Sequence, residues 1–526
     1  MPWHIYKAND HEIPHSLSTL TRAFIVVPVP VVPVLPQTMA RLQVIERTLN
    51  DYGQTHLLSF WKELDPEHQE ALLRQLQCID FKEANRLFTR AQQAAKEEVA
   101  KLDDRIKPIP PELFEAMDKM DTSVLESYRK LGLKEISEGH VAVLLLSGGQ
   151  GTRLGVEYPK GMYSVGLPSG KTLFQIQAER IRRLCNLAKQ ETGKSGKICW
   201  YIMTNNTTTE VISKFLEDHK YFGLNQQDVR LFEQGMIPCF DFDGKLILDQ
   251  KHIVTLSPDG NGGVYRALKE SGMLEDMKSR GVKYVHGHSV DNILIKVADP
   301  VFVGYCVSKQ ADCGAKVVSK NGPNEAVGVV CQVDGKFQVV EYSEITEKTA
   351  NLRDKSGNLV FNAGNICNHF FTTEFLERVA NEHDADIKLH IAKKKVPYVN
   401  DKGIRVKPTE PNGIKIEKFI FDVFPYSRKF VTLEVPRSSE FSALKNADDA
   451  GKDCPSTSRS DLLALHKLYI ESADGKVQDA DVEISPLLSY AGENLETKVK
   501  GKTFTTQTVL ISDAEKEESI RMNNGV

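Results

Sequence analysis

The feature that most constrains this chain is an apolar run that ends abruptly in glycines. Residues 140–146 read His-Val-Ala-Val-Leu-Leu-Leu, and Ser-Gly-Gly-Gln-Gly-Thr-Arg-Leu-Gly follows up to residue 155. A short continuous apolar run bounded by glycines is typical of a strand that is buried on both faces of a sheet. The apolar periodicity from Lys171 to about Ala188 then predicts a helix. The chain must therefore accommodate a strand–loop–helix unit, which indicates an α/β protein.

The loop after this strand is a candidate site for a phosphate or a nucleotide. Its four glycines between residues 148 and 155 let backbone N–H groups approach and surround an anionic ligand. Arg153 lies inside the loop and Lys160 follows it. Two cations beside such a cradle can neutralise the charge that develops in phosphoryl or nucleotidyl transfer. The alternative is a glycine-rich surface turn with solvated charges.

Two familiar phosphate-binding patterns do not fit the sequence. The dinucleotide pattern G-x-G-x-x-G would need glycine at the position of Leu154. In Gly166–Thr172 three residues separate the glycines, whereas the Walker pattern has four, and the preceding Met162–Val165 is a poor strand. These differences argue against a hydride-transferring enzyme and against a P-loop NTPase.

Composition and charge limit the partners and the compartment. The 526 residues are 41% hydrophobic and 26% charged, which is ordinary for a globular protein of several domains. Lys and Arg (67) nearly balance Asp and Glu (71), so no bulk basic field would recruit nucleic acid or an anionic membrane. The nine cysteines are scattered without a C-x-x-C pair, as is typical of reduced thiols in cytosol or nucleus. We expect a cytoplasmic protein.

The two ends of the chain differ from its middle. Residues 1–38 are predicted to be a disordered extension, because prolines interrupt the apolar stretch Phe24–Leu35 and that stretch is too short to span a bilayer. Met39 is an alternative start, and removal of the extension is expected to leave folding and activity intact. Residues 445–526 begin polar and loop-rich and then predict a helix near Ser460–Glu471 and strand-like pieces. They are expected to form a small C-terminal domain rich in β structure.

Between these ends we expect two further domains. Residues 39–138 are predicted to form an N-terminal helical domain, because their apolar residues fall at helical spacing and Asp65-Pro66-Glu67 is typical of a helix start. Residues 139–444 are predicted to form the catalytic domain. Apolar runs at Ile198–Met203 and Ala315–Val318 predict further buried strands, and Asp-Gly turns predict hairpins. Together they indicate a mixed sheet.

The glycine-rich loop also carries a resemblance to a known family. The sequence Leu-Ser-Gly-Gly-x-Gly-Thr-Arg-Leu-Gly, followed by Pro-Lys-Gly-Met-Tyr, resembles the eukaryotic UDP-N-acetylhexosamine pyrophosphorylases of the sugar nucleotidyltransferase superfamily. Further blocks match in family order from about residue 40 onward: Gln234–Met236, Pro258–Gly263, Val290–Asn292, Glu341–Glu344, Phe361–Ile366, Asn412–Lys415, Leu444–Ala447 and Ile484–Tyr490. The resemblance implies a central Rossmann-like nucleotidyltransferase domain with a mixed sheet.

The resemblance also implies a reaction. UTP and N-acetyl-α-D-glucosamine 1-phosphate would give UDP-N-acetylglucosamine, a precursor of chitin and glycans, and pyrophosphate. A sugar phosphate oxygen would attack the α-phosphorus of UTP in line, so the protein would chiefly position two anions and stabilise charge. The implied catalytic cations are Arg153, Lys160 and Lys445. Lysines such as Lys445 are otherwise typical of a solvated surface.

The same resemblance implies a nucleotide pocket and a metal ligand. The implied nucleotide-binding residues are Leu146, Ser147, Gly148, Gly149, Gln234, Gly260 and Asn261. Gln234 and Asn261 offer both a donor and an acceptor, as a pyrimidine edge requires; a plain turn at Pro258–Gly263 is the alternative. Asp291 would hold Mg²⁺, a hard cation that prefers carboxylate and phosphate oxygens. His286 and His288 precede it, so a transition-metal site with both imidazoles on one face of a strand is the competing interpretation.

The implied sugar pocket comes from later blocks. Its members are Gly328, Glu341, Tyr342, Asn365, Lys415, Phe419 and Phe421. Glu341 would accept hydrogen bonds from sugar hydroxyls, and Lys415 would reach a phosphate. Phe419 and Phe421 would share a face if the chain is extended there and would wall the N-acetyl group; ordinary core aromatics are the alternative.

Two other functions compete with this one. A UDP-glucose or broad UDP-sugar pyrophosphorylase is the nearest, although Ser147 and Gln150 differ from the loop of that family. A catalytically silent sugar-nucleotide sensor would need a pocket but not the charged set of Arg153, Lys160 and Asp291. As partners we expect the two small-molecule substrates, with neither nucleic acid nor membrane, for a monomer or homodimer.

Overall fold

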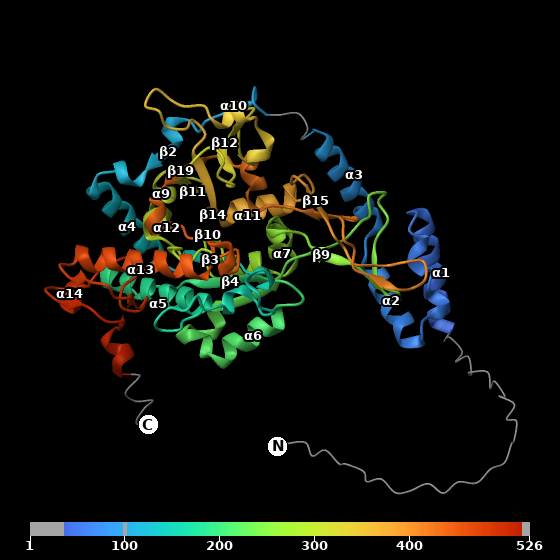
Figure 1. Ribbon diagram of the computed structural model, residues 1–526, viewed down its shortest axis with the longest axis horizontal. Helices are drawn as coiled ribbons and strands as arrows, with labels where there is room; N and C mark the ends of the chain where they lie inside the picture. Colours follow the sequence, from blue (N-terminus) through green and yellow to red (C-terminus); the bar gives the residue numbers. More distant parts are fainter. Residues whose placement is uncertain (1–35, 98–101, 518–526) are drawn as a thin grey trace, which may run out of the picture.

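The computed structural model describes residues 36–97 and 102–517 and consists of a large α/β body with an elongated lobe beside it (Figure 1). Residues 1–35 of the predicted extension lie outside the described residues. Helix α1 begins at Pro36, so the predicted boundary at residue 38 falls inside a helix. None of the helices within the described ranges is long and apolar enough to cross a membrane.

The body is built on one mixed sheet of eleven strands. Its main path runs β2-β19-β11-β14-β10-β3-β4-β5, while β12 joins β14 and pairs with β1 and β13. Strand β14 is antiparallel to both neighbours, whereas β10, β3, β4 and β5 are parallel to one another. The strands are β1 (Ile106–Lys107), β2 (Phe114–Ala116), β3 (Val141–Leu146), β4 (Cys199–Thr204), β5 (Val229–Glu233), β10 (Tyr284–Ser289), β11 (Cys313–Ser319), β12 (Val329–Val333), β13 (Lys336–Val340), β14 (Ala363–Thr372) and β19 (Phe430–Glu434). The predicted buried strands and mixed sheet are confirmed.

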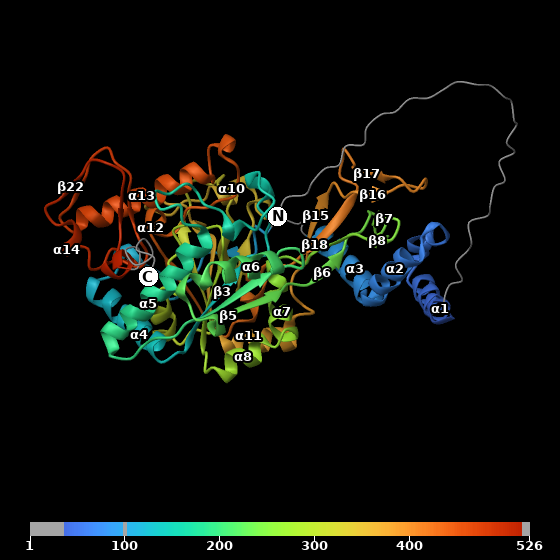
Figure 2. The ribbon, with the colours of Figure 1, turned by 90° about the horizontal axis from the view of Figure 1, so that it is seen from below.

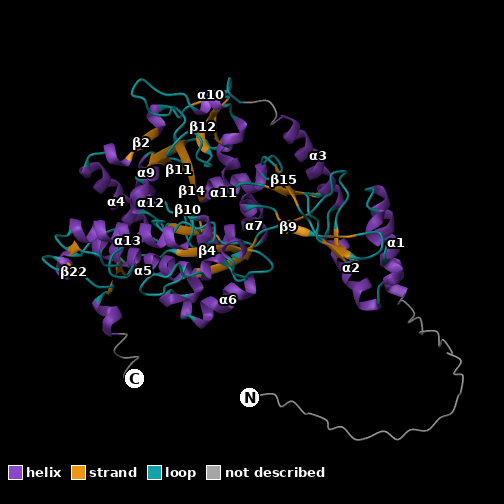
Figure 3. Ribbon diagram, viewed as in Figure 1, coloured by secondary structure: helices purple, strands orange, loops and turns teal. Residues whose placement is uncertain are grey.

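Helices cover both faces of this sheet (Figure 3). The six residues of β3 are all buried, and they alternate between two apolar clusters, because successive side chains of a strand point to opposite faces. The helices of the body are α4 (Thr122–Ser137), α5 (Leu173–Thr192), α6 (Thr209–Asp218), α7 (Val264–Glu270), α8 (Met273–Ser279), α9 (Pro300–Ser308), α10 (Glu347–Ala350), α11 (Thr373–Arg378) and α12 (Arg437–Glu440). The α/β fold class is confirmed.

The lobe beside the body has its own apolar core, built from three distant parts of the chain (Figure 2). We call it the insertion lobe; it comprises helices α1–α3 with residues 236–258 and 390–417. Its elements are α1 (Pro36–Asp51), α2 (Pro66–Cys78), α3 (Phe81–Glu97), β6 (Met236–Pro238), β7 (Leu248–Gln250), β8 (Ile253–Val254), β9 (Leu256–Pro258), β15 (His390–Lys394), β16 (Tyr398–Val399), β17 (Arg405–Val406) and β18 (Gly413–Glu417). The predicted start of α2 is confirmed, with Asp65 as its N-cap.

Residues 106–137 join the body rather than the N-terminal helices. Strand β1 pairs with β12, β2 pairs with β19, and α4 packs on α9. The prolines after Lys107 end β1 after two residues, yet the chain still adds edge strands to the sheet. This segment had been assigned from sequence to the N-terminal helical domain.

The C-terminal part forms a long helix and two short pairs of parallel strands. Its elements are α13 (Pro455–Ser472), α14 (Glu496–Val499), β20 (Lys476–Val477), β21 (Val482–Ile484), β22 (Thr503–Phe504) and β23 (Thr508–Leu510). Helix α13 begins earlier than the predicted helix, because Cys454 and Thr457 cap it at a proline. Glu483 accepts hydrogen bonds from Ser169, which docks this part on the body.

Candidate active site

The glycine-rich loop leaves the sheet where its strand order reverses. From β3 the chain proceeds through α5 to β4 on one side, whereas β10 lies on the other side of β3, and all three strands are parallel. In open α/β sheets such a switch point opens a crevice at the carboxyl ends of the strands. The loops after β3 and β10 both start there, so the fold brings Gly148 and Asp291 to the same edge.

The first residues of this loop are held tightly. Ser147 is fully buried, and its N–H donates to the carbonyl of Met203 at 2.9 Å. The carbonyl of Gly148 accepts a hydrogen bond from the Asn205 side chain. A Cβ on Gly148 would lie 2.6 Å from Nε2 of Gln234, so a larger residue would collide with that amide. The loop backbone and Gln234, two parts of the predicted nucleotide pocket, therefore lie together.

Four charged side chains meet beside the loop. Nζ of Lys160 lies 3.9 Å from Oδ2 of Asp291 and donates to the carbonyl of Leu444 at 3.0 Å. Burial lowers the pKa of Lys160, and the nearby charges of Arg153 and Lys445 lower it further, while Asp291 opposes them. The three predicted catalytic cations and the predicted metal ligand thus converge from segments far apart in sequence.

Asn292 joins the segment of Asp291 to the segment of Lys445 by hydrogen bonds. Oδ1 of this buried residue accepts the N–H groups of Leu294 (3.2 Å) and Ser442 (3.0 Å), and Nδ2 donates to the carbonyl of Glu440 (2.7 Å). The N–H of Leu444 also donates to the Asp291 carbonyl at 2.8 Å. Sequence reasoning placed Asn292 in a motif but gave it no role.

A buried ionic cluster lies behind this junction. The carboxylate of Glu440 forms ion pairs with Lys296 (2.9 Å) and Lys316 (2.9 Å), and Lys316 also pairs with Asp299 (2.5 Å). Lys316, Glu440 and Asp299 have side chains exposed by 3% or less. Breaking a buried ion pair is strongly destabilising, so these pairs hold Glu440 in place, five residues before Lys445.

The nucleotide side of the site contains Gly260 and Asn261. Gly260 has φ +89°, and a Cβ there would lie 2.3 Å from the Lys418 carbonyl, so only glycine fits this turn. Oδ1 of Asn261 accepts the N–H of Ile420 at 2.9 Å. The oxygen that we expected to serve a pyrimidine therefore already holds the chain after Phe419, and its second lone pair and the amide NH₂ remain for a ligand.

Asp259, which precedes this turn, was not singled out from sequence. It is 5% exposed, and within the described chain its Oδ1 has no hydrogen-bond partner. Burial raises its pKa to about 7, while the charges of Lys418 and Arg266 counteract the rise. A buried carboxyl that titrates near neutrality beside a ligand pocket is a recognised mark of a functional site.

The predicted sugar-binding residues come from β14, from the region of β12–β13 and from the chain after β18. A Cβ on Gly328 would lie 2.8 Å from Oε1 of Glu341, and the N–H of Asn365 donates to the Gly328 carbonyl at 2.8 Å. Burial raises the pKa of Glu341, as does nearby Glu344, whereas His390 and Lys388 oppose the rise. Tyr342 begins a short 3-10 helix (Tyr342–Glu344), but its side chain lies outside the described part of the structure.

The predicted aromatic wall is present as a pair of rings. The ring centroids of Phe419 and Phe421 lie 5.3 Å apart, tilted by 43°. The chain is extended only at Phe419 and then enters a 3-10 helix (Ile420–Tyr426), so the rings meet although the segment is not a strand. Lys415 lies on β18 opposite Ala392, and its charge opposes the rise that burial causes in the pKa of Cys239. Lys160, by contrast, lies beside Asp291 in the charged cluster.

The surroundings of the metal candidates favour Asp291 over the histidines. His286 and His288 do share a face of β10, with ring centroids 5.2 Å apart. His286 is fully buried between the N–H of Ala298 and Oδ1 of Asn368, and burial lowers the pKa of His288 to about 4. No group of three metal-binding side chains occurs in the described residues. The carboxylate of Asp291 is 21% exposed at the edge of the sheet, which suits a Mg²⁺ ion that draws most ligands from phosphates and water.

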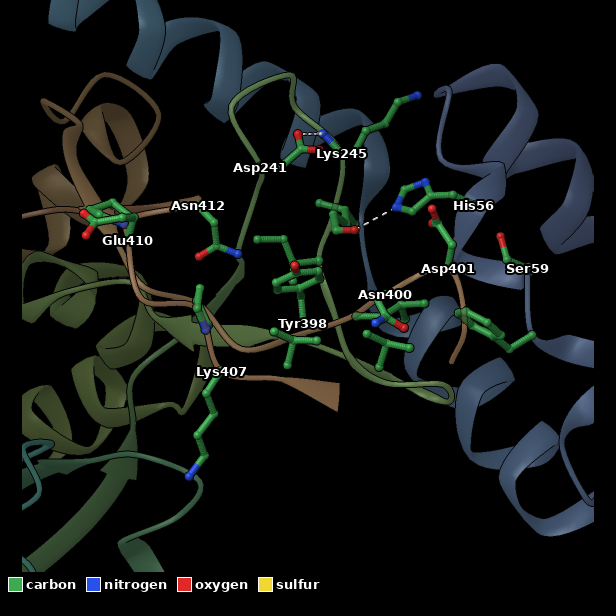
Figure 4. A pocket seen from close by; sticks show the side chains of 18 of the residues that line it. His56, Ser59, Asp241, Lys245, Tyr398, Asn400, Asp401, Lys407, Glu410 and Asn412 are labelled. Atoms are coloured by element: carbon green, nitrogen blue, oxygen red, sulfur yellow. Dashed lines mark hydrogen bonds between the residues drawn. The ribbon is translucent and has the colours of Figure 1, made fainter. Parts of the chain in front are cut away.

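A separate cavity of about 1020 Å³ lies in the insertion lobe (Figure 4). Its walls come from the segment between α1 and α2, including His56, from residues 241–248, and from the chain between Tyr398 and Asn412. None of the predicted site residues lines it. The cavity is therefore not part of the charged site.

Comparisons with known proteins identify the family of this chain. A family model described as UTP–glucose-1-phosphate uridylyltransferase matches residues 81–498. The chain belongs to this family. Among its members, a UDP-N-acetylhexosamine pyrophosphorylase-like protein 1 of Xenopus tropicalis is 51% identical, over 88% of this chain and 94% of that protein. The UDP-N-acetylglucosamine pyrophosphorylase of Saccharomyces cerevisiae is 43% identical, over 87% of this chain and 97% of its own length.

A solved structure from the same family has the same fold. The uridine diphosphate N-acetylglucosamine pyrophosphorylase of Trypanosoma brucei, crystallised with an inhibitor, is 29% identical and has a TM-score of 0.78. The match covers 90% of this chain and 98% of that one. The resemblance inferred from the glycine-rich loop and the later blocks is confirmed.

Proposed function

We propose that this protein transfers a uridylyl group from UTP to N-acetylglucosamine 1-phosphate, forming UDP-N-acetylglucosamine and releasing pyrophosphate. The convergence of Arg153, Lys160 and Lys445 on Asp291, beside a glycine-rich loop at the switch point, carries the proposal. A binding pocket alone does not need three cations at mutual electrostatic cost, so the arrangement argues against a silent sensor. Family membership and the names of the relatives support the same reaction.

The chemistry follows from this charge distribution. A phosphate oxygen of the sugar attacks the α-phosphorus of UTP, and the bond from that phosphorus to the pyrophosphate oxygen breaks. Negative charge then grows on the transferring group and on the departing pyrophosphate. The charged form of Lys160, disfavoured by burial and by its cationic neighbours, is stabilised by that negative charge. Such preorganised donors stabilise the transition state without a covalent intermediate.

We infer that the reaction uses a divalent cation, with Mg²⁺ held by Asp291. Asp291 would hold the ion, which would supply neutralisation of phosphate charge when bound. Nζ of Lys160 lies 3.9 Å from Oδ2 of the same carboxylate, so this cation is next to the group that would hold the metal.

We assign the two substrate pockets to the remaining predicted residues. The backbone of residues 146–149 with Gln234, Gly260 and the Asn261 amide would bind the nucleotide. Gly328, Glu341, Tyr342 and Asn365 would bind the sugar, with Phe419 and Phe421 against the N-acetyl group and Lys415 toward a phosphate. We further infer a cytoplasmic monomer or homodimer, in keeping with nine cysteines that are all free thiols in the described chain.

The deciding experiment is pyrophosphate release from UTP with a panel of sugar 1-phosphates, with and without Mg²⁺. We expect turnover only with the metal and preference for N-acetylhexosamine 1-phosphates. Glucose 1-phosphate is the second candidate substrate, because the matching family model bears the name of a glucose-1-phosphate uridylyltransferase. Equal or faster turnover of glucose 1-phosphate would replace our proposal with that activity, and no turnover of any sugar phosphate would favour a sensor.

A further inference from the structure

Phe419 is held from two directions. Its backbone N–H donates to Oδ2 of Asp422 at 2.7 Å, and its ring stacks on the imidazole of His390, with centroids 4.2 Å apart and planes 29° apart. Nε2 of His390 in turn bonds the same carboxylate at 3.0 and 3.1 Å. One carboxylate therefore fixes both the main chain of Phe419 and the ring that packs on its side chain.

The strand register adds a third restraint. His390 pairs with Glu417 across β15 and β18, two residues before Phe419. The side chains of His390 and Asp422 are 17% and 5% exposed, so the clamp is largely shielded from water. Phe419 itself is only partly buried. A core aromatic needs no such clamp, whereas an aromatic surface presented to a ligand does.

The same imidazole lies beside the sugar-pocket carboxylate. His390 and Lys388 are the neighbours that oppose the raised pKa of Glu341, while Glu344 and Asp422 act in the other direction. His390 is thus near both the apolar wall and the hydroxyl acceptor of the assigned sugar pocket.

We propose that His390 is a specificity-determining positioning residue that holds the ring of Phe419 against the acetamido group of the substrate. This inference rests on the proposed function of the site. A fixed aromatic face gains contact with the methyl and amide plane of a 2-acetamido group but has little to gain from a 2-hydroxyl, which stays better hydrated. His390 therefore favours N-acetylhexosamine over hexose 1-phosphates without touching the reacting phosphates.

Two substitutions separate the stack from the hydrogen bond. His390→Gln keeps a donor for Asp422 but removes the ring, and His390→Phe keeps a ring but removes the donor. With UTP and Mg²⁺, the ratio of kcat/KM for N-acetylglucosamine 1-phosphate to that for glucose 1-phosphate should fall about threefold to tenfold in His390→Gln. It should fall less in His390→Phe, and the KM for UTP should not change.

His383→Ala is the matched control, because His383 stacks on Tyr426 at the same 4.2 Å centroid distance but outside this clamp. It should leave the ratio unchanged, and thermal melting verifies that each variant is folded. An unchanged ratio in both His390 variants, or an equal loss for both sugars, would overturn the inference.

Failure of the proposed function would look different, since wild-type protein would then not turn over N-acetylglucosamine 1-phosphate. In that case calorimetry with UDP-N-acetylglucosamine and UDP-glucose decides the inference. A lower affinity ratio in His390→Gln supports it, and an unchanged ratio refutes it.

Discussion

The charged cluster at Lys160 and the aromatic clamp at Phe419 are built in opposite ways. In the cluster, three cations face one carboxylate, and the pKa of Lys160 is lowered by burial and by its neighbours. In the clamp, His390, Asp422 and Phe419 already satisfy one another by stacking and hydrogen bonding. The first region lacks the negative charge that substrates bring, whereas the second is complete without them. Changes in the cluster should therefore alter kcat, and changes around the clamp should alter KM for the sugar phosphate.

The largest effect is expected from Lys160→Ala. Loss of one preorganised charge-stabilising donor typically costs about 10²–10³ in rate, so kcat should fall by that factor. The melting temperature should change little, because the substitution also removes repulsion from Arg153 and Lys445. Steady-state kinetics and thermal melting test both statements.

Lys309→Ala is the matched control for this variant. Lys309 is also partly exposed and paired with a carboxylate, that of Glu115, but it lies at the C-terminal end of α9, as its C-cap. It should keep wild-type kcat. If Lys160→Ala also kept it, the charged cluster would not be the catalytic region and the comparison would fail.

Asn292→Ala should affect the charged cluster indirectly, by removing hydrogen bonds that join the segments of Asp291 and Lys445. The variant would leave the Leu294 and Ser442 N–H groups and the Glu440 carbonyl without partners, and a buried unsatisfied group costs about 1–3 kcal/mol. We expect a lower free energy of unfolding in urea and a kcat reduced about tenfold or more, because a small misplacement of Lys445 is costly in rate. Asn351→Ala removes an exposed amide that also donates to a carbonyl, that of Glu347, and should change neither quantity. A wild-type kcat in Asn292→Ala would show that Lys445 is placed by other contacts.

A substitution in the insertion lobe tests the region of the aromatic clamp, because β15 and β18 belong to this lobe. The buried Gln54 carboxamide donates to the Gly244 carbonyl at 2.9 Å and accepts from Leu246 N–H at 3.0 Å. Gln54→Ala should lower stability by about 1–3 kcal/mol. Through β15 and β18 it should raise KM for the sugar phosphate more than KM for UTP. The exposed Gln77, which bonds Arg41, supplies the control Gln77→Ala. An equal rise in both KM values would contradict the division between the two regions.

The last prediction concerns Asp259 and the pH dependence of stability, not kcat or KM. Its pKa is raised from 3.8 to about 7 by burial, so the folded chain retains a proton between these values that the unfolded chain has lost. Stability should therefore fall as pH rises through this window, and the penalty is fully present above about pH 7. Asp259→Asn removes this contribution. The free energy of unfolding of the variant, relative to that of the wild type, should therefore increase from pH 4 to pH 8. Parallel pH profiles for the two proteins would show that Lys418 and Arg266 keep the carboxylate charged.

Local patterns in the sequence predicted much of the fold. The buried strand β3, the helix α5 and the hairpin of β12 and β13 follow from apolar periodicity and from an Asp-Gly turn, which act over a few residues. The start of α2 at Asp65-Pro66 was equally visible, since capping is a local interaction. The edge strands β1 and β2 were not, because a two- or three-residue strand is defined by its partner rather than by its own pattern.

The sequence by itself determined the glycine loop, the residue types around it and the family, because these depend on local chemistry and on the order of motifs. Only the tertiary structure decided that Lys160 and Lys445 meet at Asp291, that the Asn261 oxygen is already engaged, and that His390 supports Phe419. Each of these contacts joins segments separated by many residues of chain. Their geometry depends on strand order and on how three distant segments share one core in the insertion lobe, which no local pattern specifies.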